Sequence, residues 1–215
     1  MIRERDIKAY RGYLLNRAIQ KRPRLAWPAL LFFLYGCTTA EVQMGRQALF
    51  NDKPDEALAR FQRVAQTEPD YVNRYFKEGV WTYVGRSQYM AGNYSEARQS
   101  LEKALSQHGD DYFARLYLGL TLARTGDRPT GLQDIESGIR GIYQANEDMR
   151  EHGTLELWDQ QKVIRKETEN ILAMISSKNF DWDNLISSSE WLGNKFEEEL
   201  DLAMEDDQID NSPRW

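Results

Sequence analysis

The sequence is poor in the side chains on which enzymes and metal sites most often depend. Its 215 residues include one cysteine and two histidines, and they contain no glycine-rich phosphate loop. Zinc ligation needs more Cys and His at short spacing than this, and a single cysteine forms no internal disulfide. His108 and His152 fall in predicted turns, where histidines are commonly solvated. We therefore expect no catalytic residues, no metal and no cofactor, and we do not expect an enzyme.

The acidic stretches near the C-terminus do not follow the pattern of a calcium loop. "EEELD" at residues 197–201 and "EDDQID" at residues 205–210 lack the central glycine and the alternating ligand spacing of such a loop. These stretches predict a solvated acidic face of the protein.

Charge is distributed unevenly along the chain. Residues 1–36 carry eight Lys or Arg against two Asp or Glu, which gives a net charge of +6. The remainder carries 20 basic and 32 acidic residues, which gives a net charge of −12. Because phosphates are held by clustered cations, the acidic remainder argues against nucleic-acid binding. The basic segment adjoins an apolar run, and that combination is typical of a targeting signal.

The apolar run itself is short and ends on the only cysteine, Cys37. It is "LAWPALLFFLYG" at residues 25–36, twelve residues long. A membrane-spanning helix needs roughly 20 apolar residues, whereas this length is normal for the hydrophobic region of a secretory signal. The last residues, "LYGC", resemble the lipobox of bacterial lipoproteins, in which a Leu and a small residue precede the modified cysteine. Tyr35 is the one position that departs from that pattern.

The lipoprotein resemblance implies a signal peptide over residues 1–36, cleavage before Cys37 and a lipid on the Cys37 side chain. Two or more acyl chains give stable membrane anchoring, whereas one chain is marginal. Thr38 stands where an Asp would typically retain such a protein in the inner membrane, so we expect an outer-membrane location facing the periplasm. The alternative is an uncleaved anchor with a free, partly buried cysteine.

Three segments of the remaining chain share the phase of their small and large residues. Small residues recur at Ala57, Ala97 and Gly131, and a glycine precedes each by twelve positions, at Gly45, Gly85 and Gly119. A large apolar residue follows each by four positions, at Phe61, Leu101 and Ile135. Small residues at this spacing let two antiparallel helices approach closely, and a fixed repeat of this kind indicates stacked helix pairs.

This pattern resembles the tetratricopeptide repeat (TPR) family. The signature residues are Gly45, Ala57, Phe61 and Pro69 in the first unit, Trp81, Gly85, Gly92, Tyr94 and Ala97 in the second, and Gly119, Gly126 and Gly131 in the third. The resemblance implies an all-α fold, a right-handed α-solenoid of TPR-like helix pairs. The repeat domain would cover residues 37–145, with units at about 38–71, 78–111 and 112–145. Six extra residues before the second unit predict that its first helix is longer by nearly two turns.

Beyond residue 145 the apolar spacing predicts further helices rather than further repeats. Residues 146–206 carry helical stripes that suit C-terminal capping helices, because a solenoid needs a terminal element with a polar outer face. The later of these helices either packs within the chain or binds in trans. Residues 207–215 form an acidic tail that we expect to be frayed.

The TPR resemblance also implies a concave groove that binds a protein or peptide partner. The groove positions it assigns are Val42, Arg46, Phe50, Thr82, Arg86, Tyr89, Leu120 and Arg124. Arginine and aromatic side chains are typical interface anchors. We expect Arg46 and Arg86 to pair with carboxylates of the partner.

Three functions are consistent with the sequence. The leading prediction is a lipid-anchored periplasmic scaffold or adaptor in an envelope-associated complex, for assembly, secretion or export. A second is a ligand- or solute-handling component of a transport system that uses Trp81, Tyr83, Tyr89 and Tyr94, for which a deep apolar cavity would be favourable evidence. A third is a cytoplasmic scaffold anchored to the inner membrane, which requires that the signal is neither exported nor cleaved.

Overall fold

The computed structural model describes residues 27–73, 77–152, 158–159 and 161–210, without the side chains of residues 27–37, 152 and 204–210. The chain divides into two compact units, Met1–Ala40 and Glu41–Trp215. Helix α2 (Trp27–Phe50) begins in the first unit and ends in the second. Most of the predicted signal peptide, residues 1–26, lies outside the described residues, as does the end of the predicted tail, residues 211–215. No helix within the described ranges is both long and apolar enough to cross a membrane.

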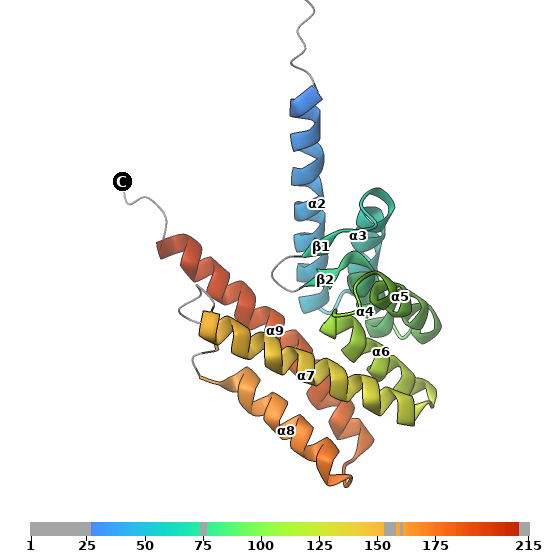
Figure 1. The fold of residues 1–215 in the computed structure, drawn as a ribbon. Helices are drawn as coiled ribbons and strands as arrows, with labels where there is room; N and C mark the ends of the chain where they lie inside the picture. Colours follow the sequence, from blue (N-terminus) through green and yellow to red (C-terminus); the bar gives the residue numbers. More distant parts are fainter. Residues whose placement is uncertain (1–26, 74–76, 153–157, 160, 211–215) are drawn as a thin grey trace, which may run out of the picture. The chain divides into compact units, whose positions relative to one another are not determined.

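The second unit consists mainly of helices that pair in chain order (Figure 1). After α2 come α3 (Pro54–Thr67), α4 (Val80–Met90), α5 (Tyr94–Gln107), α6 (Tyr112–Thr125) and α7 (Arg128–His152). Each helix from α3 to α6 packs against the next one along the chain. The predicted all-α, TPR-like helical repeat fold is therefore confirmed.

These helices begin and end at residues of the types that favour helix boundaries. Pro54 is the first residue of α3. A backbone N–H at this position has no acceptor within the helix, so proline, which lacks the N–H, costs no hydrogen bond there. Asp111 caps α6 by accepting a hydrogen bond from the Ala114 N–H at 2.8 Å. Gly92 and Gly126 follow α4 and α6 with φ angles of 77° and 105°, a left-handed conformation that glycine adopts without steric cost.

The phased glycines lie where two helices of a pair come closest. A Cβ atom on Gly45 would stand 2.6 Å from the Phe61 ring. A Cβ atom on Gly119 would stand 2.5 Å from the backbone nitrogen of Ile135. Each glycine thus faces the large apolar residue of the same repeat unit in the neighbouring helix. The repeated residues are therefore those at which the two helices of a pair touch.

A short β-hairpin precedes the second helix pair in place of a longer first helix. Strand β1 (Val72–Asn73) pairs antiparallel with β2 (Glu78–Gly79), and α4 begins only at Val80. Lys77 has a φ of 52°, outside the right-handed helical region. The Val80 N–H donates to the Tyr71 carbonyl at 2.9 Å. The predicted longer helix is wrong, because strand pairing satisfies this backbone in place of helical hydrogen bonds.

Two further helices complete the second unit. Helix α8 (Val163–Ser177) packs on α7, and α9 (Trp182–Asp210) packs on α6, α7 and α8. Ile164, Ile171, Leu192, Phe196 and Leu200 are fully buried in the core cluster that these helices share with α5, α6 and α7. The C-terminal helices therefore pack within the chain. Helix α7 also continues to His152, past the predicted boundary at residue 145.

Candidate partner-binding groove

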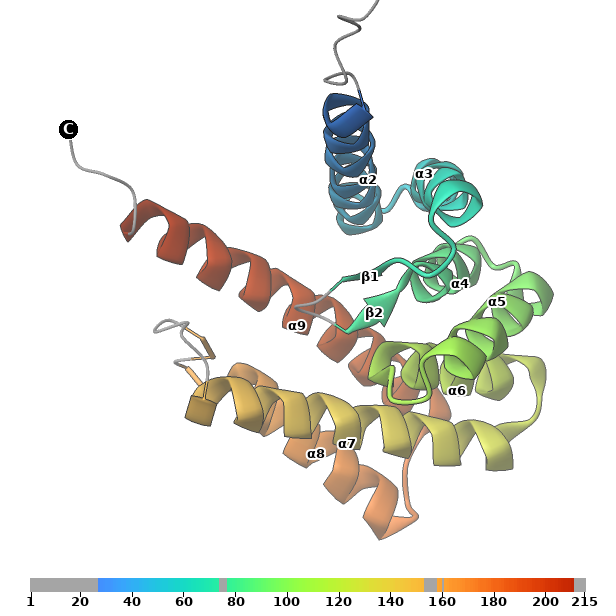
Figure 2. The same cartoon turned by 45° about the horizontal axis from the view of Figure 1, so that its top comes forward.

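The first helices of the three pairs hold α9 of the same chain by side-chain contacts. One arginine from each helix bonds to it: Arg46 from α2, Arg86 from α4 and Arg124 from α6. Figure 2 shows α9 running past the β-hairpin toward α6. The contacting residues on α9 follow a spacing of four, three and four, at Glu190, Asn194, Glu197 and Asp201. That spacing places them on one face of the helix.

A buried cluster of charges lies at the centre of this contact. The Arg86 guanidinium donates to Glu78 at 2.5 Å and to Glu197 at 2.7 Å. Arg46 donates to both carboxylate oxygens of Asp201, at 3.0 and 2.9 Å, and its Nε lies 3.5 Å from Glu197. The side chains of Arg86 and Glu78 are 1% and 0% exposed. Charge-assisted hydrogen bonds of this kind are strong, and a buried charge requires them.

Two aromatic rings lie against the Arg86 guanidinium. Its Cζ lies 4.8 Å from the centre of the Tyr117 ring and 5.1 Å from that of Phe113. Cation–π contacts at these distances favour a desolvated guanidinium. Nearby, Tyr83 stacks on Phe61 at 4.8 Å between ring centres, and both are completely buried. Phe61 and Tyr83 therefore belong to the core and do not line a surface.

The protonation states in the cluster follow from burial and from the two arginines. Burial raises the pKa of Glu78 well above its ordinary value, although the charge of Arg86 opposes the shift. Burial also acts against ionised Glu197, but Arg86 and Arg46 outweigh it and lower the pKa of Glu197. Burial thus favours the neutral form of Glu78, and the two arginines favour the ionised form of Glu197. The two arginines are then balanced by two anions, Glu197 and Asp201.

Asp111 joins the hairpin to the second and third helix pairs. Besides capping α6, its carboxylate accepts hydrogen bonds from the Gly79 N–H at 3.0 Å and from the Thr82 hydroxyl at 2.6 Å. Burial raises the pKa of Asp111, against the effect of these donors. Three hydrogen bonds to one buried carboxylate hold β2 and the start of α4 beside the start of α6.

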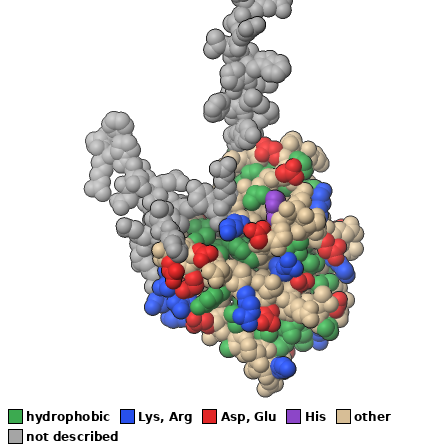
Figure 3. Space-filling view, in the orientation of Figure 1, with side chains coloured by type: hydrophobic (Ala, Val, Ile, Leu, Met, Phe, Trp, Pro, Cys, Tyr) green, Lys and Arg blue, Asp and Glu red, His purple; other side chains and the backbone are tan. Residues whose placement is uncertain are grey.

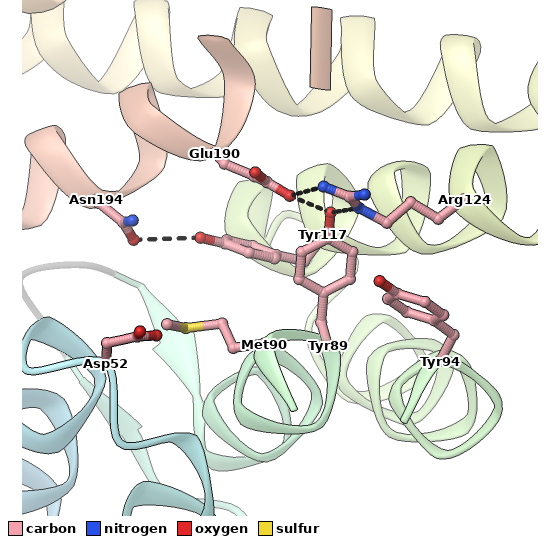
Figure 4. Close-up of a pocket in the computed structure, with 8 residues that line it drawn as sticks. All are labelled: Asp52, Tyr89, Met90, Tyr94, Tyr117, Arg124, Glu190 and Asn194. Carbon is pink, nitrogen blue, oxygen red and sulfur yellow. Dashed lines mark hydrogen bonds and ion pairs between the residues drawn. The ribbon is translucent and has the colours of Figure 1, made fainter. Parts of the chain in front are cut away.

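A second polar contact between the groove and α9 borders an open pocket of about 270 Å³. The Tyr89 hydroxyl donates to Glu190, and Arg124 donates to the Tyr89 oxygen at 2.6 Å and to Glu190 at 2.8 Å. Figure 4 shows Glu190 linked to both residues, with Asp52 and Met90 on the opposite wall. The other lining residues are Tyr94, Tyr117 and Asn194.

The pocket does not have the character that the ligand-handling prediction requires. Small-molecule sites typically have volumes of roughly 300–1,000 Å³ and mostly apolar walls. This pocket is smaller and is lined by charged and hydroxyl groups as well as rings. Of the four aromatic residues proposed for that role, Tyr83 is completely buried, and Lys103 lies 3.4 Å above the ring of Trp81. Tyr89 and Tyr94 are the two that line the pocket.

The structure corrects the expected accessibility of the groove residues. Val42, Arg46, Thr82, Arg86 and Leu120 are at most 2% exposed, so their side chains offer no surface to a partner in this conformation. The carboxylates that Arg46 and Arg86 were expected to meet are present, but they belong to α9 and to the hairpin. Tyr89 and Arg124 line the pocket, and Phe50 is 38% exposed.

Sequence reasoning identified the arginines but missed their carboxylate partners. The "EEELD" stretch is only partly a solvated face, because Glu197 is 2% exposed and Asp201 20%, whereas Glu198 is 55% exposed. The signal lay in the helical spacing of Glu190, Asn194, Glu197 and Asp201 beside an apolar stripe. The sequence around Glu78 has no comparable pattern, because Glu78 is placed by the pairing of β2 with β1.

The predicted lipidation site lies in the first unit, on α2. The helix backbone is continuous through Cys37, whose side chain is outside the described ones. Lipid attachment at Cys37 stays a prediction. Among the described residues no group of three or more His, Cys, Asp or Glu is arranged to hold a metal ion.

Comparison with known proteins supports the repeat fold. Residues 81–111, which cover α4 and α5, match the family model of the tetratricopeptide repeat. No curated protein and no solved structure matches the chain. The chain therefore contains TPR-like repeats, which serve in general as protein–protein interaction scaffolds and are typically not enzymes.

Proposed function

We propose that this protein is a lipid-anchored periplasmic scaffold whose repeat unit binds a protein partner in an envelope-associated complex. The observation that carries the anchoring part is the position of Cys37 relative to the unit boundary at Ala40. Cleavage before Cys37 would remove no residue of the second unit, Glu41–Trp215. It would leave residues 37–50 of α2, 14 residues, the same length as the 14-residue helices α3, α5 and α6.

The sequence before Cys37 supports the same processing step. Residues 1–36 are basic and end in an apolar run of signal-peptide length. A lipid on Cys37 would tether the repeat unit with few intervening residues, and two or more acyl chains would make the attachment stable. Thr38 favours the outer membrane as the destination.

The partner-binding part of the proposal rests on the repeat fold and on large apolar side chains that remain exposed on α2 and α9. Met44, Phe50, Trp191 and Leu202 are large apolar side chains with 38–50% exposure. Aromatic and Met side chains are enriched at protein interfaces. On the face shown in Figure 3, charged side chains of both signs are interspersed, so no single charge dominates that view.

Metabolic labelling with a clickable fatty acid tests the anchoring step. We expect label on the wild-type chain and none on Cys37→Ala, with Thr38→Ala labelled as the wild type. We also expect the mass of the labelled chain to correspond to a protein that begins at Cys37. Equal labelling of wild type and Cys37→Ala, or a labelled chain that retains residues 1–36, would contradict the proposal. Density-gradient separation of the membranes then distinguishes outer-membrane from inner-membrane anchoring.

The partner is tested by cross-linking in intact cells, followed by purification from solubilised membranes. A scaffold should give discrete cross-linked species that contain another envelope protein. If protease added outside the inner membrane leaves the repeat unit intact after the outer membrane is opened, the unit faces the cytoplasm. That result would favour the inner-membrane scaffold instead.

A further inference from the structure

We propose that the pocket beside α9 receives a lysine or arginine side chain of the protein partner. This inference rests on the proposed scaffold function and names the chemistry of its contact. The pocket is the part of the groove region that α9 leaves open, and its volume of about 270 Å³ suits one side chain.

The charges that line the pocket favour a cation. Arg124 and Glu190 neutralise each other through their contact at 2.8 Å. Asp52, on the turn between α2 and α3, has no side-chain hydrogen bond or ion pair with the described residues. The pocket therefore has one uncompensated negative charge, and it is open to solvent.

A tyrosine ring supplies the second requirement of such a site. Tyr89, Tyr94 and Tyr117 line the pocket. Arg124 and Arg86 already lie over Tyr89 and Tyr117, which are 5% and 1% exposed, so the half-buried Tyr94 is the ring that remains for a partner. A guanidinium or ammonium group is attracted to a tyrosine face within about 6 Å. The chain shows this chemistry itself, since Arg86 lies over Tyr117 while it pairs with Glu197.

Two exposed aromatic residues lie close in the sequence to residues that line the pocket. Phe50 precedes Asp52 by two positions, and Trp191 follows Glu190 directly. They are 38% and 46% exposed, and on α9 the helical period places Trp191 next to the face that carries Glu190 and Asn194. Aromatic side chains around a charged pocket match the anatomy of an interaction hot spot.

Photo-cross-linking of the full chain in its own membrane tests this assignment. A photo-reactive amino acid replaces Trp191 in one strain and Gln62, an exposed residue of α3, in the control strain. We expect a partner to be captured at Trp191 and not at Gln62. Mass spectrometry should then place the captured segment beside a Lys or Arg of the partner.

Removal of the charge at Asp52 provides the decisive measurement. Asp52→Asn keeps the left-handed backbone at φ 54°, which Asn tolerates, while Asp55→Asn makes the same charge change away from the pocket. We expect Asp52→Asn to lower the cross-link yield roughly 1.4- to fivefold, the range for an exposed ion pair. Asp55→Asn should leave the yield unchanged, and circular dichroism should show both variants folded.

The possible outcomes separate this inference from the scaffold proposal. Equal yields for the two Asn variants, or a captured segment without Lys or Arg, would overturn the assignment of the pocket. Capture at Gln62 but not at Trp191 would overturn the pocket and leave the scaffold standing. Failure to capture any protein at either position would count against both.

Discussion

Replacement of Glu78 by Gln tests the charge assignment of the buried cluster. Gln has the shape of a protonated Glu, and like it keeps an acceptor for Arg86 and carries a hydrogen-bond donor. If Glu78 is neutral in the folded protein, Glu78→Gln preserves these contacts at neutral pH. If Glu78 is ionised, the same change removes a buried anion that faces Arg86 at 2.5 Å.

The pH dependence gives the sign and size of the effect. The folded-state pKa of Glu78 is raised, so its contribution to stability is complete below the ordinary value of 4.5 and is lost as the pH rises toward the folded pKa. Over that window the wild type loses about 1.4 kcal/mol of unfolding free energy per pH unit from this group. Glu78→Gln does not titrate. We expect it to match the wild type near pH 4 and to be more stable at pH 7.

Glu197→Gln is the matched comparison and should behave in the opposite way. Its carboxylate lies between Arg86 and Arg46, and its pKa is lowered. Loss of one member of a buried ion pair costs about 3–5 kcal/mol. This cost should be present at pH 7 and should shrink only as the pH falls through the lowered folded pKa.

Urea unfolding followed by circular dichroism at pH 4, 5, 6, 7 and 8 measures both variants. The reasoning predicts that the stability curves of Glu78→Gln and Glu197→Gln diverge with rising pH. If Glu78→Gln is as destabilising at pH 7 as Glu197→Gln, Glu78 is ionised in the folded protein and the charge balance inferred for the cluster is refuted.

Two further substitutions test the packing and the cap of α6. Gly138→Ala should lower the unfolding free energy by about 1–3 kcal/mol, because its Cβ would stand 2.6 Å from the Leu116 backbone; Gly109→Ala, with its nearest atom at 3.8 Å, should change it little. Asp111→Ala should lower the unfolding free energy by about 1–3 kcal/mol, because it leaves buried hydrogen-bond donors unpaired. Asp110 is exposed, and Asp110→Ala should change the unfolding free energy little. Thermal unfolding compares each pair, and equal midpoints within either pair would contradict the corresponding contact.

Local pattern in the sequence was sufficient for the repeat architecture. Gly45, Phe61, Gly119 and Ile135 could be placed in phase because a helix repeats its faces every 3.6 residues. Residues close in sequence decide such contacts, and the structure brings these glycines and apolar residues together. The same reasoning failed at the hairpin, because the number of inserted residues does not show whether their backbone is helical or extended.

The groove could not be predicted in full because its charges pair over long distances in the chain. The sequence by itself determined helix pairs, the small residues that let them pack, and arginines that need carboxylates. The tertiary structure alone decided which carboxylates these are: Glu197 lies 111 residues from Arg86, and Asp201 lies 155 residues from Arg46. A buried arginine requires an anion, but nothing in its local sequence specifies which segment supplies it. That choice depends on how α9 packs its apolar face, and it determines which part of the groove remains open to a partner.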